Sequence, residues 1–505
     1  MTADLVEVSY NGITKAVPMG TKLSTFLEKP LVCGGHGKCG KCKVLAKGFL
    51  SPVSENEKKL LSQEEITTGI RLACSATVQG PCDVQIFSID EGREQILTQA
   101  YTSCVENVPL FSSYGVAVDI GTTTLAAKLF DVSGRELACA ATMNPQSKWG
   151  ADVISRMEAA AHGEATGLAL CIRRAVNKMI RDMAENSFVP EEEINAVVLT
   201  GNTAMLYLLT GTTTEPLLHA PFSAARLFGE FLTAEDIGLN ALRPKARIYL
   251  PPCISAFVGA DIVCAILSTQ VHRANHQWQL LVDIGTNGEM ALCGKNRIMV
   301  CSTAAGPAFE GGGISMGMQG TAGAVDHVSW DGKTLHAHVI GELVPVGICG
   351  SGLIDAVASL LECGSLDESG FLENAPITVA DPVKLTQNDI RMVQLAKSAV
   401  CAGIQTLMDS VGLGSENIAS FLVAGGFGNY MDIQNACRIG LIPQSLQDRA
   451  QVVGNAALSG ACQLLLCKDM CNEAVDIVSM ARVVPLDSNP IFAEYYVSGM
   501  LFDQQ

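Results

Sequence analysis

The chain has 505 residues, of which 48% are hydrophobic and 17% charged, and this composition supports large cores in roughly two to four domains. Its net charge of −17 argues against a nucleic-acid partner, because neutralisation of phosphates by Lys and Arg supplies most of that affinity. No run approaches about 18 consecutive apolar residues, and Met1–Glu7 lacks the basic and apolar regions of a signal peptide. We therefore expect a cytoplasmic protein without a membrane span, whose 19 cysteines are metal ligands or core residues rather than disulfides.

The start of the chain predicts a β-hairpin followed by a short helix. Leu5–Tyr10 and Ile13–Pro18 are separated by Asn11-Gly12, the strongest two-residue hairpin turn. Thr21 is the expected N-cap of a helix that runs from Lys22 to about Glu28. A hairpin followed by a helix is typical of a small β-grasp domain, which is an α+β fold.

Three cysteines fall in a glycine-rich loop, and a fourth follows later in the chain. Cys33, Cys39 and Cys42 have the spacing C-x5-C-x2-C, and Cys74 is the expected fourth ligand. Four thiolates can hold a [2Fe-2S] cluster, and glycines let backbone N–H groups approach the sulfur atoms and help set the potential. The alternative is a zinc site with four cysteine ligands, but such sites favour two C-x2-C pairs and this segment has one.

The cysteine spacing is similar to that of [2Fe-2S] ferredoxins of the vertebrate and bacterial types. Cys82 follows Cys74 closely and competes with it as the fourth ligand. The resemblance favours Cys74, because Arg71-Leu72-Ala73-Cys74 matches the last ligand position of that family. We therefore expect residues 1–88 to form a [2Fe-2S] ferredoxin-like β-grasp domain.

Residues 89–113 show weak periodicity and mixed polarity, which is typical of a linker. A tether at this point would join two domains that move relative to each other. We expect it to let the cluster domain swing between an electron donor and an acceptor.

The segment from 114 to 505 contains an internal repeat. Val116–Thr124 is echoed by Leu281–Glu289, and each copy predicts a buried strand, an Asp-x-Gly-Thr turn and a second strand. Two further pairs follow in the same order, one of strands that end in glycine turns and one of helices. They are 197–202 with 421–429, and 258–263 with 350–356. The repeat predicts two α/β halves, about 114–278 and 279–505, with a cleft between them.

The repeated turn suits a nucleotide phosphate. Its backbone N–H groups and hydroxyls can bind phosphate oxygens, and its aspartate can hold Mg²⁺ through water. Asp119 begins the first turn and Asp283 the second, so two such turns can clamp a triphosphate from both sides. A structural glycine turn in an unrelated α/β fold is the alternative, and the repetition in register argues against it.

The repeat resembles the superfamily of actin, sugar kinases and heat-shock chaperone ATPases. The resemblance implies an α/β actin-like, ribonuclease H-like duplicated ATPase domain, in which the turns at Asp119 and Asp283 are the two phosphate motifs. It makes 425–428 the adenosine motif and the segments at 258 and 350 the connecting helices. The residues that it implies for ATP binding are Gly121, Thr122, Thr123, Gly285, Thr286, Asn287, Gly425, Gly426 and Gly428.

Within this ATPase domain we assign Asp119 and Asp283 to Mg²⁺ and its water shell. Positioning and charge stabilisation carry most of phosphoryl-transfer catalysis, so a further carboxylate is expected to place the attacking water. Glu310, in a glycine-rich loop, is instead a candidate for partner docking or nucleotide sensing, with an ordinary surface role as the alternative. The candidates for placing the attacking water are, in order, Glu289, Asp152 and Asp261.

Three further stretches narrow the resemblance: Asn144-Pro145-Gln146 with 150–156, Gly201–Met205, and Ala305–Ile314. Together with the N-terminal [2Fe-2S] domain, they are similar to the reductive activators of corrinoid-dependent methyltransferases over nearly the whole chain. The resemblance implies ATP-dependent reduction of an inactive Co(II) corrinoid protein to Co(I), with the electron delivered through the [2Fe-2S] cluster. It also implies Mg²⁺ with the ATP, a reduced ferredoxin, flavodoxin or flavoprotein as electron donor, and a homodimer.

Two features depart from the better-known members of that family. The first phosphate motif arrives at Asp119, which leaves no room for the small middle domain that some members carry. Cys462, Cys467 and Cys471 are too few and wrongly spaced for an added [4Fe-4S] module, and we expect them to pack as small hydrophobic residues in a helix. The identity of the corrinoid partner is therefore left open.

Other functions are compatible with the same motifs. They are a small-molecule kinase with a fused ferredoxin, an activator of 2-hydroxyacyl-CoA dehydratase or of another low-potential iron–sulfur or radical enzyme, and a non-catalytic ATP-binding redox sensor. No sugar or acid pocket is recognisable, and dehydratase activators share a [4Fe-4S] cluster and lack the ferredoxin domain. ATP turnover stimulated by a partner would exclude the sensor.

Overall fold

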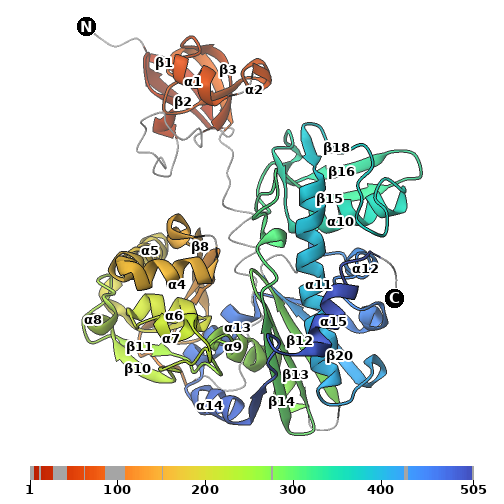
Figure 1. Cartoon of the computed structure of the whole chain (residues 1–505). Helices are drawn as coiled ribbons and strands as arrows, with labels where there is room; N and C mark the ends of the chain where they lie inside the picture. The colour runs from red at the N-terminus through yellow and green to blue at the C-terminus, as the bar shows by residue number, and fades with distance from the viewer. Residues whose placement is uncertain are drawn as a thin grey trace. The chain divides into compact units, whose positions relative to one another are not determined.

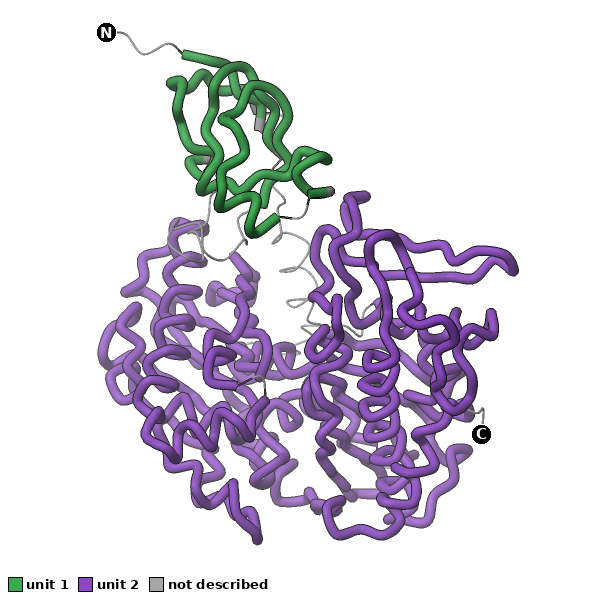
Figure 2. Tube along the Cα trace, turned by 45° about the horizontal axis from the view of Figure 1, so that its top comes forward, with its two compact units in different colours: residues 1–89 green, residues 90–505 purple. Residues whose placement is uncertain are grey.

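The computed structural model describes residues 5–10, 13–26, 43–61, 63–85, 108–150, 152–274, 277–425 and 430–502 (Figure 1). The chain forms two compact units, Met1–Ile89 and Asp90–Gln505, which Figure 2 colours separately. Each unit is built around its own sheets and its own hydrophobic core.

The N-terminal unit is a five-stranded sheet in the order β2-β1-β5-β3-β4. The predicted hairpin is confirmed, with Tyr10 paired to Ile13, and its first strand continues the sheet parallel to β5. The mixed sheet with its short helices agrees with the predicted α+β ferredoxin-like fold. The strands are β1 (Leu5–Tyr10), β2 (Ile13–Pro18), β3 (Lys43–Leu50), β4 (Ile70–Leu72) and β5 (Val78–Gln85).

The helix predicted after the hairpin differs from expectation. Among the described residues it is a single 3-10 turn, Leu23–Phe26. The Thr21 hydroxyl donates to the carbonyl oxygen of Pro18 at 2.6 Å, so it closes the turn after β2 instead of capping a helix. Two short helices, α1 (Glu55–Leu60) and α2 (Gln63–Thr68), lie between β3 and β4.

The C-terminal end of the predicted linker belongs to the large unit. Leu110 and Phe111 are 8% and 5% exposed and pack into its core. The backbone N–H of Leu110 donates to Leu465 and that of Lys468 donates to Val108, both at 2.9 Å. A tether therefore ends before Val108 rather than at residue 113, and residues 89–107 lie outside the described part of the chain.

The large unit contains two six-stranded sheets with the same plan, ordered β10-β11-β9-β6-β7-β8 and β21-β20-β12-β13-β14-β22. In each, the first strand pairs antiparallel with the next strand and parallel with a later one, as β6 does with β7 and β9. The first sheet holds β6 (Tyr114–Ile120), β7 (Thr124–Asp131), β8 (Glu136–Met143), β9 (Ile194–Gly201), β10 (Glu230–Thr233) and β11 (Arg247–Leu250). The second holds β12 (Trp278–Ile284), β13 (Gly288–Gly294), β14 (Arg297–Thr303), β20 (Ile418–Ala424), β21 (Ala450–Gly454) and β22 (Ala481–Val483).

Helices cover both sheets, and two of them lie between the sheets. Along β6, Val116 and Val118 point into a core that includes side chains of α5 and α6, while Ala117 points into a core shared with α9 and α13. Figure 1 shows α9 and α13 side by side in the centre of the unit. The helices of the two halves are α4 (Val153–Ala159), α5 (Ala165–Asn186), α6 (Thr203–Thr210), α7 (Glu215–Leu218), α8 (Ala234–Ile237), α9 (Ala260–Thr269), α11 (Gln387–Asp409), α12 (Ile433–Arg438), α13 (Ala456–Leu466), α14 (Met470–Met480) and α15 (Pro490–Ser498).

The second half carries an additional layer between β14 and α11. Figure 1 shows its strands and helix α10 gathered around one end of the long helix α11. The Gly352 position packs against the strand β15, where a Cβ atom would lie 2.2 Å from the carbonyl oxygen of Val325. The elements are β15 (Ala324–Trp330), β16 (Leu335–Val339), β17 (Gly347–Ile348), α10 (Gly350–Glu362), β18 (Ile377–Ala380) and β19 (Val383–Leu385).

The third predicted repeat pair, 258–263 with 350–356, is wrong. The helix at 260 follows β11 in the first sheet, and the helix in the same place of the second sheet is α13, which follows β21. The segment at 350 begins α10 of the additional layer. Both segments start with glycine and continue as a buried helix, so the sequence pattern alone does not separate them.

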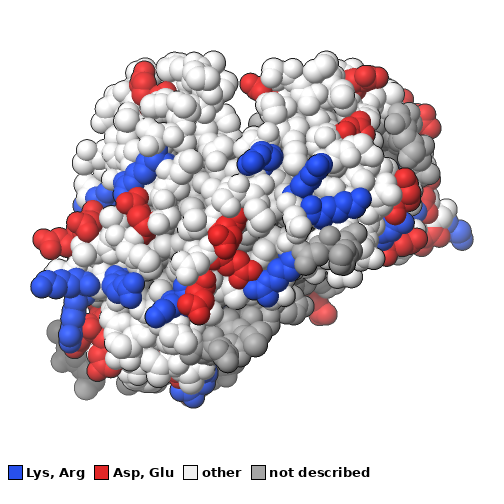
Figure 3. Space-filling model, turned by 90° about the horizontal axis from the view of Figure 1, so that it is seen from below, with Lys and Arg blue, Asp and Glu red and all other residues white. Residues whose placement is uncertain are grey.

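The helices and the charged surface residues bear on membrane and nucleic-acid binding. None of the helices in the described ranges combines the length and the apolar character needed to cross a bilayer. On the face seen in Figure 3, Lys and Arg side chains are interspersed with Asp and Glu over a mostly uncharged surface. The described residues on that face therefore form no continuous basic area.

Candidate functional site

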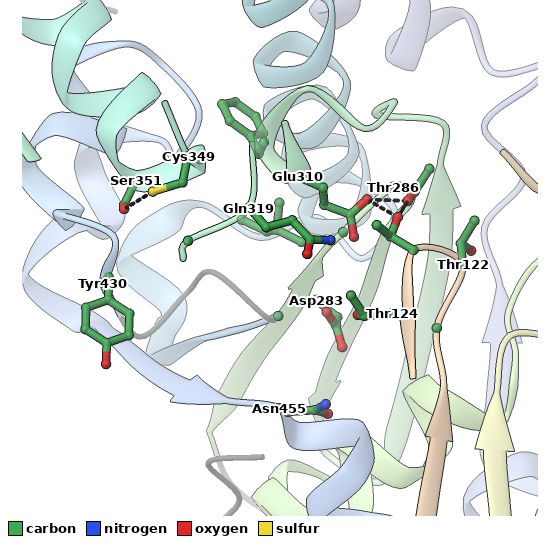
Figure 4. A pocket seen from close by; sticks show the side chains of 18 of the residues that line it. Thr122, Thr124, Asp283, Thr286, Glu310, Gln319, Cys349, Ser351, Tyr430 and Asn455 are labelled. Carbon is green, nitrogen blue, oxygen red and sulfur yellow. Dashed lines mark hydrogen bonds between the residues drawn. The ribbon is translucent and has the colours of Figure 1, made fainter. Parts of the chain in front are cut away.

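The carboxyl ends of β6 and β12 open into a cavity of about 350 Å³ in the large unit. In Figure 4, Thr122 belongs to the loop after β6 and Thr286 to the loop after β12, while Asp283 lies near the end of β12 and Asn455 at the start of α13. The cavity lies where the two halves of the duplicated fold meet, so both halves can reach a single ligand.

Each of the two loops is held close to a glycine from the neighbouring strand. A Cβ atom at Gly201 would lie 2.6 Å from the carbonyl oxygen of Ile120, and one at Gly425 would lie 2.4 Å from that of Ile284. Gly425 also has φ 123°, which residues with a side chain rarely adopt. Glycine at these two positions therefore allows the strands to approach each other where the loops begin.

Three buried side chains hold the first loop in shape. Asn144 Nδ2 donates to the carbonyl oxygen of Gly121 at 2.9 Å, and Arg156 Nη1 donates to that of Thr122 at 2.7 Å. Asn202 Nδ2 donates to the Thr122 hydroxyl at 3.1 Å. These residues come from two of the stretches that carried the family resemblance, so those stretches support the loop from behind.

Four carboxylates gather at the base of the cavity. Asp283 and Glu289 face each other on the paired strands β12 and β13. Removal from water raises the pKa of Asp119 to about 6, although Asn455 Nδ2 donates to it at 3.0 Å. Burial and then repulsion from neighbouring carboxylates raise the pKa of Asp261 to about 7 and that of Asp283 to about 8. The same two causes raise the pKa of Glu289.

This set of oxygen atoms fits a hard divalent cation such as Mg²⁺, which takes oxygen ligands and keeps several waters. No group of three or more His, Cys, Asp or Glu side chains in the described ranges is placed to hold a metal ion. Carboxylates can hold Mg²⁺ through its bound waters as well as directly. Neither Lys nor Arg is among the described residues that line the cavity.

The raised pKa values predict a pH-dependent response to Mg²⁺. In the unfolded protein aspartates titrate near about 3.9, whereas in the metal-free folded protein the pKa values of these aspartates are raised. Between about pH 4 and about pH 8 the folded state therefore binds more protons than the unfolded state. The free energy of unfolding consequently falls as pH rises through this range. Mg²⁺ offsets the repulsion between the ionised groups. We expect MgCl₂ to raise the unfolding temperature of the large unit more at about pH 8.5 than at about pH 6. An equal increase at both pH values would contradict this assignment.

Glu310 joins the two loops to each other. It lies at the end of a 3-10 turn, Ala308–Glu310, and its Oε2 accepts hydrogen bonds from Thr123 Oγ1 at 2.9 Å and from Thr286 Oγ1. The two hydroxyl oxygens lie 3.2 Å apart. Figure 4 shows Glu310 beside Thr286 inside the cavity, so the Glu310 carboxylate belongs to the site and is not an ordinary surface group.

Most of the predicted nucleotide-site residues line this cavity. Glu289 and Asp261, two of the three candidates for placing a water molecule, lie within it. The third candidate, Asp152, instead accepts from Ser155 N at 2.9 Å as the N-cap of α4, which is a structural role. Gly426 and Gly428 fall outside the described residues. The predicted residues in the lining are Asp119, Gly121, Thr122, Thr123, Asp283, Gly285, Thr286, Asn287 and Gly425.

Sequence reasoning gave no role to two residues that shape the site. Asn455 is the N-cap of α13 and binds Asp119 of the opposite half. Its signal was an asparagine between a glycine and a run of small helix-forming residues, which is typical of an N-cap. Arg156 is only 1% exposed and lies behind the first loop. An arginine on a predicted helix is usually exposed, so nothing in the sequence indicated that this side chain is buried.

In the N-terminal unit a buried ion pair fixes the segment that carries Cys74. Glu57 is completely buried and accepts from Arg71 Nε at 2.8 Å and from the backbone N–H of Leu72 at 3.0 Å. Burial opposes its ionisation, but the hydrogen bonds from Arg71, Ser54 and Leu72 lower the pKa of Glu57 overall. Cys74 follows this clamp in a turn after β4 and is 5% exposed.

The other cysteine predictions can be tested only in part. Cys33, Cys39 and Cys42 lie outside the described residues. Cys82 is on β5 and packs in the core of the sheet with Val8 and Val84, and burial raises the pKa of its thiol. Cys74 lies in a turn instead of a strand, and its assignment as the fourth ligand stays a prediction.

The C-terminal cysteines pack within the α13–α14 region. Cys462 is fully buried in α13, as predicted for a small hydrophobic residue. Cys467 follows α13 and Cys471 lies in α14, and both are partly buried. Burial raises the pKa of Cys471 to about 11, so its thiol stays protonated.

Two family models together match nearly all of the large unit. One is described as the C-terminal, ASKHA domain of RACo and matches residues 277–505, and the other is described as the RACo middle region and matches residues 114–274. The middle-region model covers the first six-stranded sheet, and the C-terminal model covers the second. The residues matched by the middle-region model form the first six-stranded sheet and include the first Asp-x-Gly-Thr turn, so the expectation about a separate small domain before that turn stays a prediction.

Relatives of known function extend the similarity over most of the chain. The corrinoid activation enzyme RamQ of Eubacterium limosum is 31% identical over 77% of this chain and 70% of its own length. The [Co(II) methylated amine-specific corrinoid protein] reductase of Methanosarcina barkeri is 27% identical over 77% of each. The solved structure of a reductive activator for corrinoid, iron-sulfur protein has a TM-score of 0.74 and 27% identity, and covers 98% of both chains. The chain therefore belongs to the family of reductive activators of corrinoid proteins.

Proposed function

We propose that this chain uses ATP hydrolysis to drive the reduction of a Co(II) corrinoid protein to Co(I). The electron is delivered through a [2Fe-2S] cluster in the N-terminal unit. The observation that carries this proposal is a cavity clamped by two phosphate loops in a chain that also holds a ferredoxin-like domain. Its similarity to corrinoid activators over most of its length supports the same conclusion.

The residues of the cavity have separate tasks in this proposal. Asp119 and Asp283 hold the water shell of Mg²⁺, and the hydroxyls of Thr122, Thr123 and Thr286 bind phosphate oxygens. When bound, Mg²⁺ supplies the positive charge that offsets the phosphates. Glu289 and Asp261 orient the attacking water, because both lie among the carboxylates at the base of the cavity.

The N-terminal unit provides the cluster ligands Cys33, Cys39, Cys42 and Cys74. When bound, the cluster supplies a one-electron donor. The Glu57–Arg71 pair keeps the Cys74 segment in place, whereas Cys82 packs in the core of the sheet. The proposed electron donor to the cluster is a reduced ferredoxin, flavodoxin or flavoprotein. The proposed oligomeric state of the chain is a homodimer.

ATP is needed because the reduction of Co(II) is energetically uphill. An unfavourable potential difference costs about 2.3 kcal/mol per 100 mV for each electron. ATP binding and hydrolysis can offset this cost only if the nucleotide states of the activator differ in affinity for the partner's states. The cavity between the two halves gives the nucleotide a means to bias such states.

The test is to follow the Co(I) absorption band after the anaerobic, reduced protein is mixed with a Co(II) corrinoid protein, with and without ATP. We expect Co(I) only with ATP, and its loss in Asp283→Asn and in Cys74→Ser. Cys74→Ser is also expected to lose the [2Fe-2S] spectrum, whereas the matched control Cys82→Ala keeps it. Failure to form Co(I) with any corrinoid protein, despite an intact cluster and ATP turnover, would contradict the proposed function.

A further inference from the structure

Glu310 occupies an anion site that is built from both halves of the large unit. The hydroxyl of Thr123 comes from the first phosphate loop and that of Thr286 from the second, and both donate to the same carboxylate oxygen. Hydroxyls that converge on one oxygen atom are the arrangement that binds a phosphate oxygen as well as a carboxylate. The carboxylate thus lies between the two loops that are proposed to clamp a triphosphate.

A buried cation favours negative charge at this position. Arg156 is 1% exposed and reaches the back of the first loop, where Nη1 donates to Thr122. Burial lowers the pKa of Arg156 to about 10, so the guanidinium remains charged at neutral pH. Burial raises the pKa of Glu310, and the hydrogen bonds from Thr286 and Thr123 and the charge of Arg156 act in the opposite direction. The cavity lining has neither Lys nor Arg among the described residues. Arg156 therefore supplies a positive charge from behind the first loop and not from the lining.

Glu310 is carried by a segment with glycine on both sides. Gly306 has φ 78° and Gly311 has φ 82°, conformations that suit glycine. The N–H of Gly306 donates to the carbonyl oxygen of Thr286 at 2.9 Å, and a Cβ atom at Gly350 would lie 2.0 Å from the carbonyl oxygen of Phe309. The backbone beside Glu310 therefore touches both the second phosphate loop and the start of α10.

We infer that the Glu310 carboxylate fills the position of the terminal phosphate when no triphosphate is bound, so that Glu310 makes the site distinguish ATP from ADP. The inference rests on the proposed nucleotide function of the cavity. The third phosphate of ATP displaces Glu310 from Thr123 and Thr286 and takes over both hydroxyls. ADP lacks this phosphate and leaves Glu310 in place between the loops.

Displacement of Glu310 gives the rest of the unit a signal of nucleotide state. With ADP, one carboxylate ties the two loops together through hydrogen bonds to both halves. With ATP, the phosphate makes these bonds, and the Glu310 side chain and the short turn that carries it, Ala308–Glu310, shift away from the two hydroxyls. Because Phe309 packs against Gly350, this movement reaches α10 and the additional layer.

The test compares the affinities of Mg²⁺-bound AMPPNP and Mg²⁺-bound ADP by calorimetry on the full chain. In Glu310→Ala we expect the AMPPNP affinity to increase by about tenfold relative to the ADP affinity, which corresponds to about 1.4 kcal/mol. Glu310→Gln removes the charge while keeping the shape, and we expect a smaller change in the same direction. Glu368→Gln, at an exposed carboxylate, is the matched control and should leave the ratio unchanged.

The outcomes separate this inference from the proposed function. An AMPPNP-to-ADP ratio that stays the same or falls in both Glu310 variants, with both nucleotides still bound, would overturn the inference alone. Absence of binding of either nucleotide to the unsubstituted protein would contradict the nucleotide site itself, and the inference with it. ADP affinity serves as the internal reference, because a general distortion of the cavity would weaken both nucleotides together.

Discussion

Substitution of Asp283 by asparagine is expected to lower the rate of ATP hydrolysis by at least about 100-fold. Asp283 lies next to the last residue of β12, beside the second phosphate loop, and is proposed to hold Mg²⁺. Its pKa of about 8 in the metal-free site means that the side chain is mostly neutral there at neutral pH. Asparagine has nearly the same shape as the neutral acid, so the metal-free fold should be as stable as before.

The measurement is steady-state ATP turnover together with thermal unfolding in the absence of Mg²⁺. Asp487→Asn, at an exposed aspartate, is the matched control and should change neither quantity. Hydrolysis at more than about a tenth of the normal rate in Asp283→Asn would show that this carboxylate does not hold the cation. A large fall in the unfolding temperature would show instead that the variant loses activity through its fold.

Substitution of Glu57 by alanine is expected to destabilise the N-terminal unit by about 3–5 kcal/mol, because it leaves Arg71 buried without its partner. That cost is comparable to the whole stability of a small domain, so the visible absorption of the cluster should be lost. ATP turnover by the large unit should persist. The lowered pKa of Glu57 also makes the stability of this unit depend on pH. The ionised Glu57 side chain stabilises the folded unit above about pH 4.5, and this stabilisation is lost as pH falls through the folded-state pKa of Glu57.

Glu55→Ala is the matched control for the Glu57 experiment. Glu55 lies in the same helix and pairs with Lys58, but its side chain is 79% exposed, and such surface pairs contribute about 0–1 kcal/mol. Unfolding of the N-terminal unit is measured by limited proteolysis and by bleaching of the cluster during heating. Equal unfolding temperatures for the two variants would show that the buried pair does not stabilise the Cys74 segment.

The local elements of this fold could be predicted from the sequence. The first hairpin follows from its Asn-Gly turn, and the two phosphate loops follow from a buried strand that ends in Asp-x-Gly-Thr. The division of the large unit into two similar α/β halves follows from the repetition of these elements. Such features depend on residues that are close together in the chain, and so their pattern is visible without the structure.

The parts of the site that join the two halves could not be predicted in the same way. Glu310 and Thr123 are 187 residues apart, and Asn455 and Asp119 are 336 residues apart. Contacts of this kind depend on how the sheets pack, which no local pattern records. The third repeat pair failed for a related reason, because a helix that begins with glycine gives no indication of the sheet on which it packs.

The central helices α9 and α13 meet so closely that no side chain separates them at their crossing. A Cβ atom at Gly460 would lie 2.0 Å from the carbonyl oxygen of Cys264, so backbone rests on backbone at this point. The two halves are in direct backbone contact at this point, and neither helix can move closer to the other. Closure of the cleft cannot bring these two helices nearer to each other, so the loops around the cavity have to close by a rotation or a sliding movement that preserves this backbone contact.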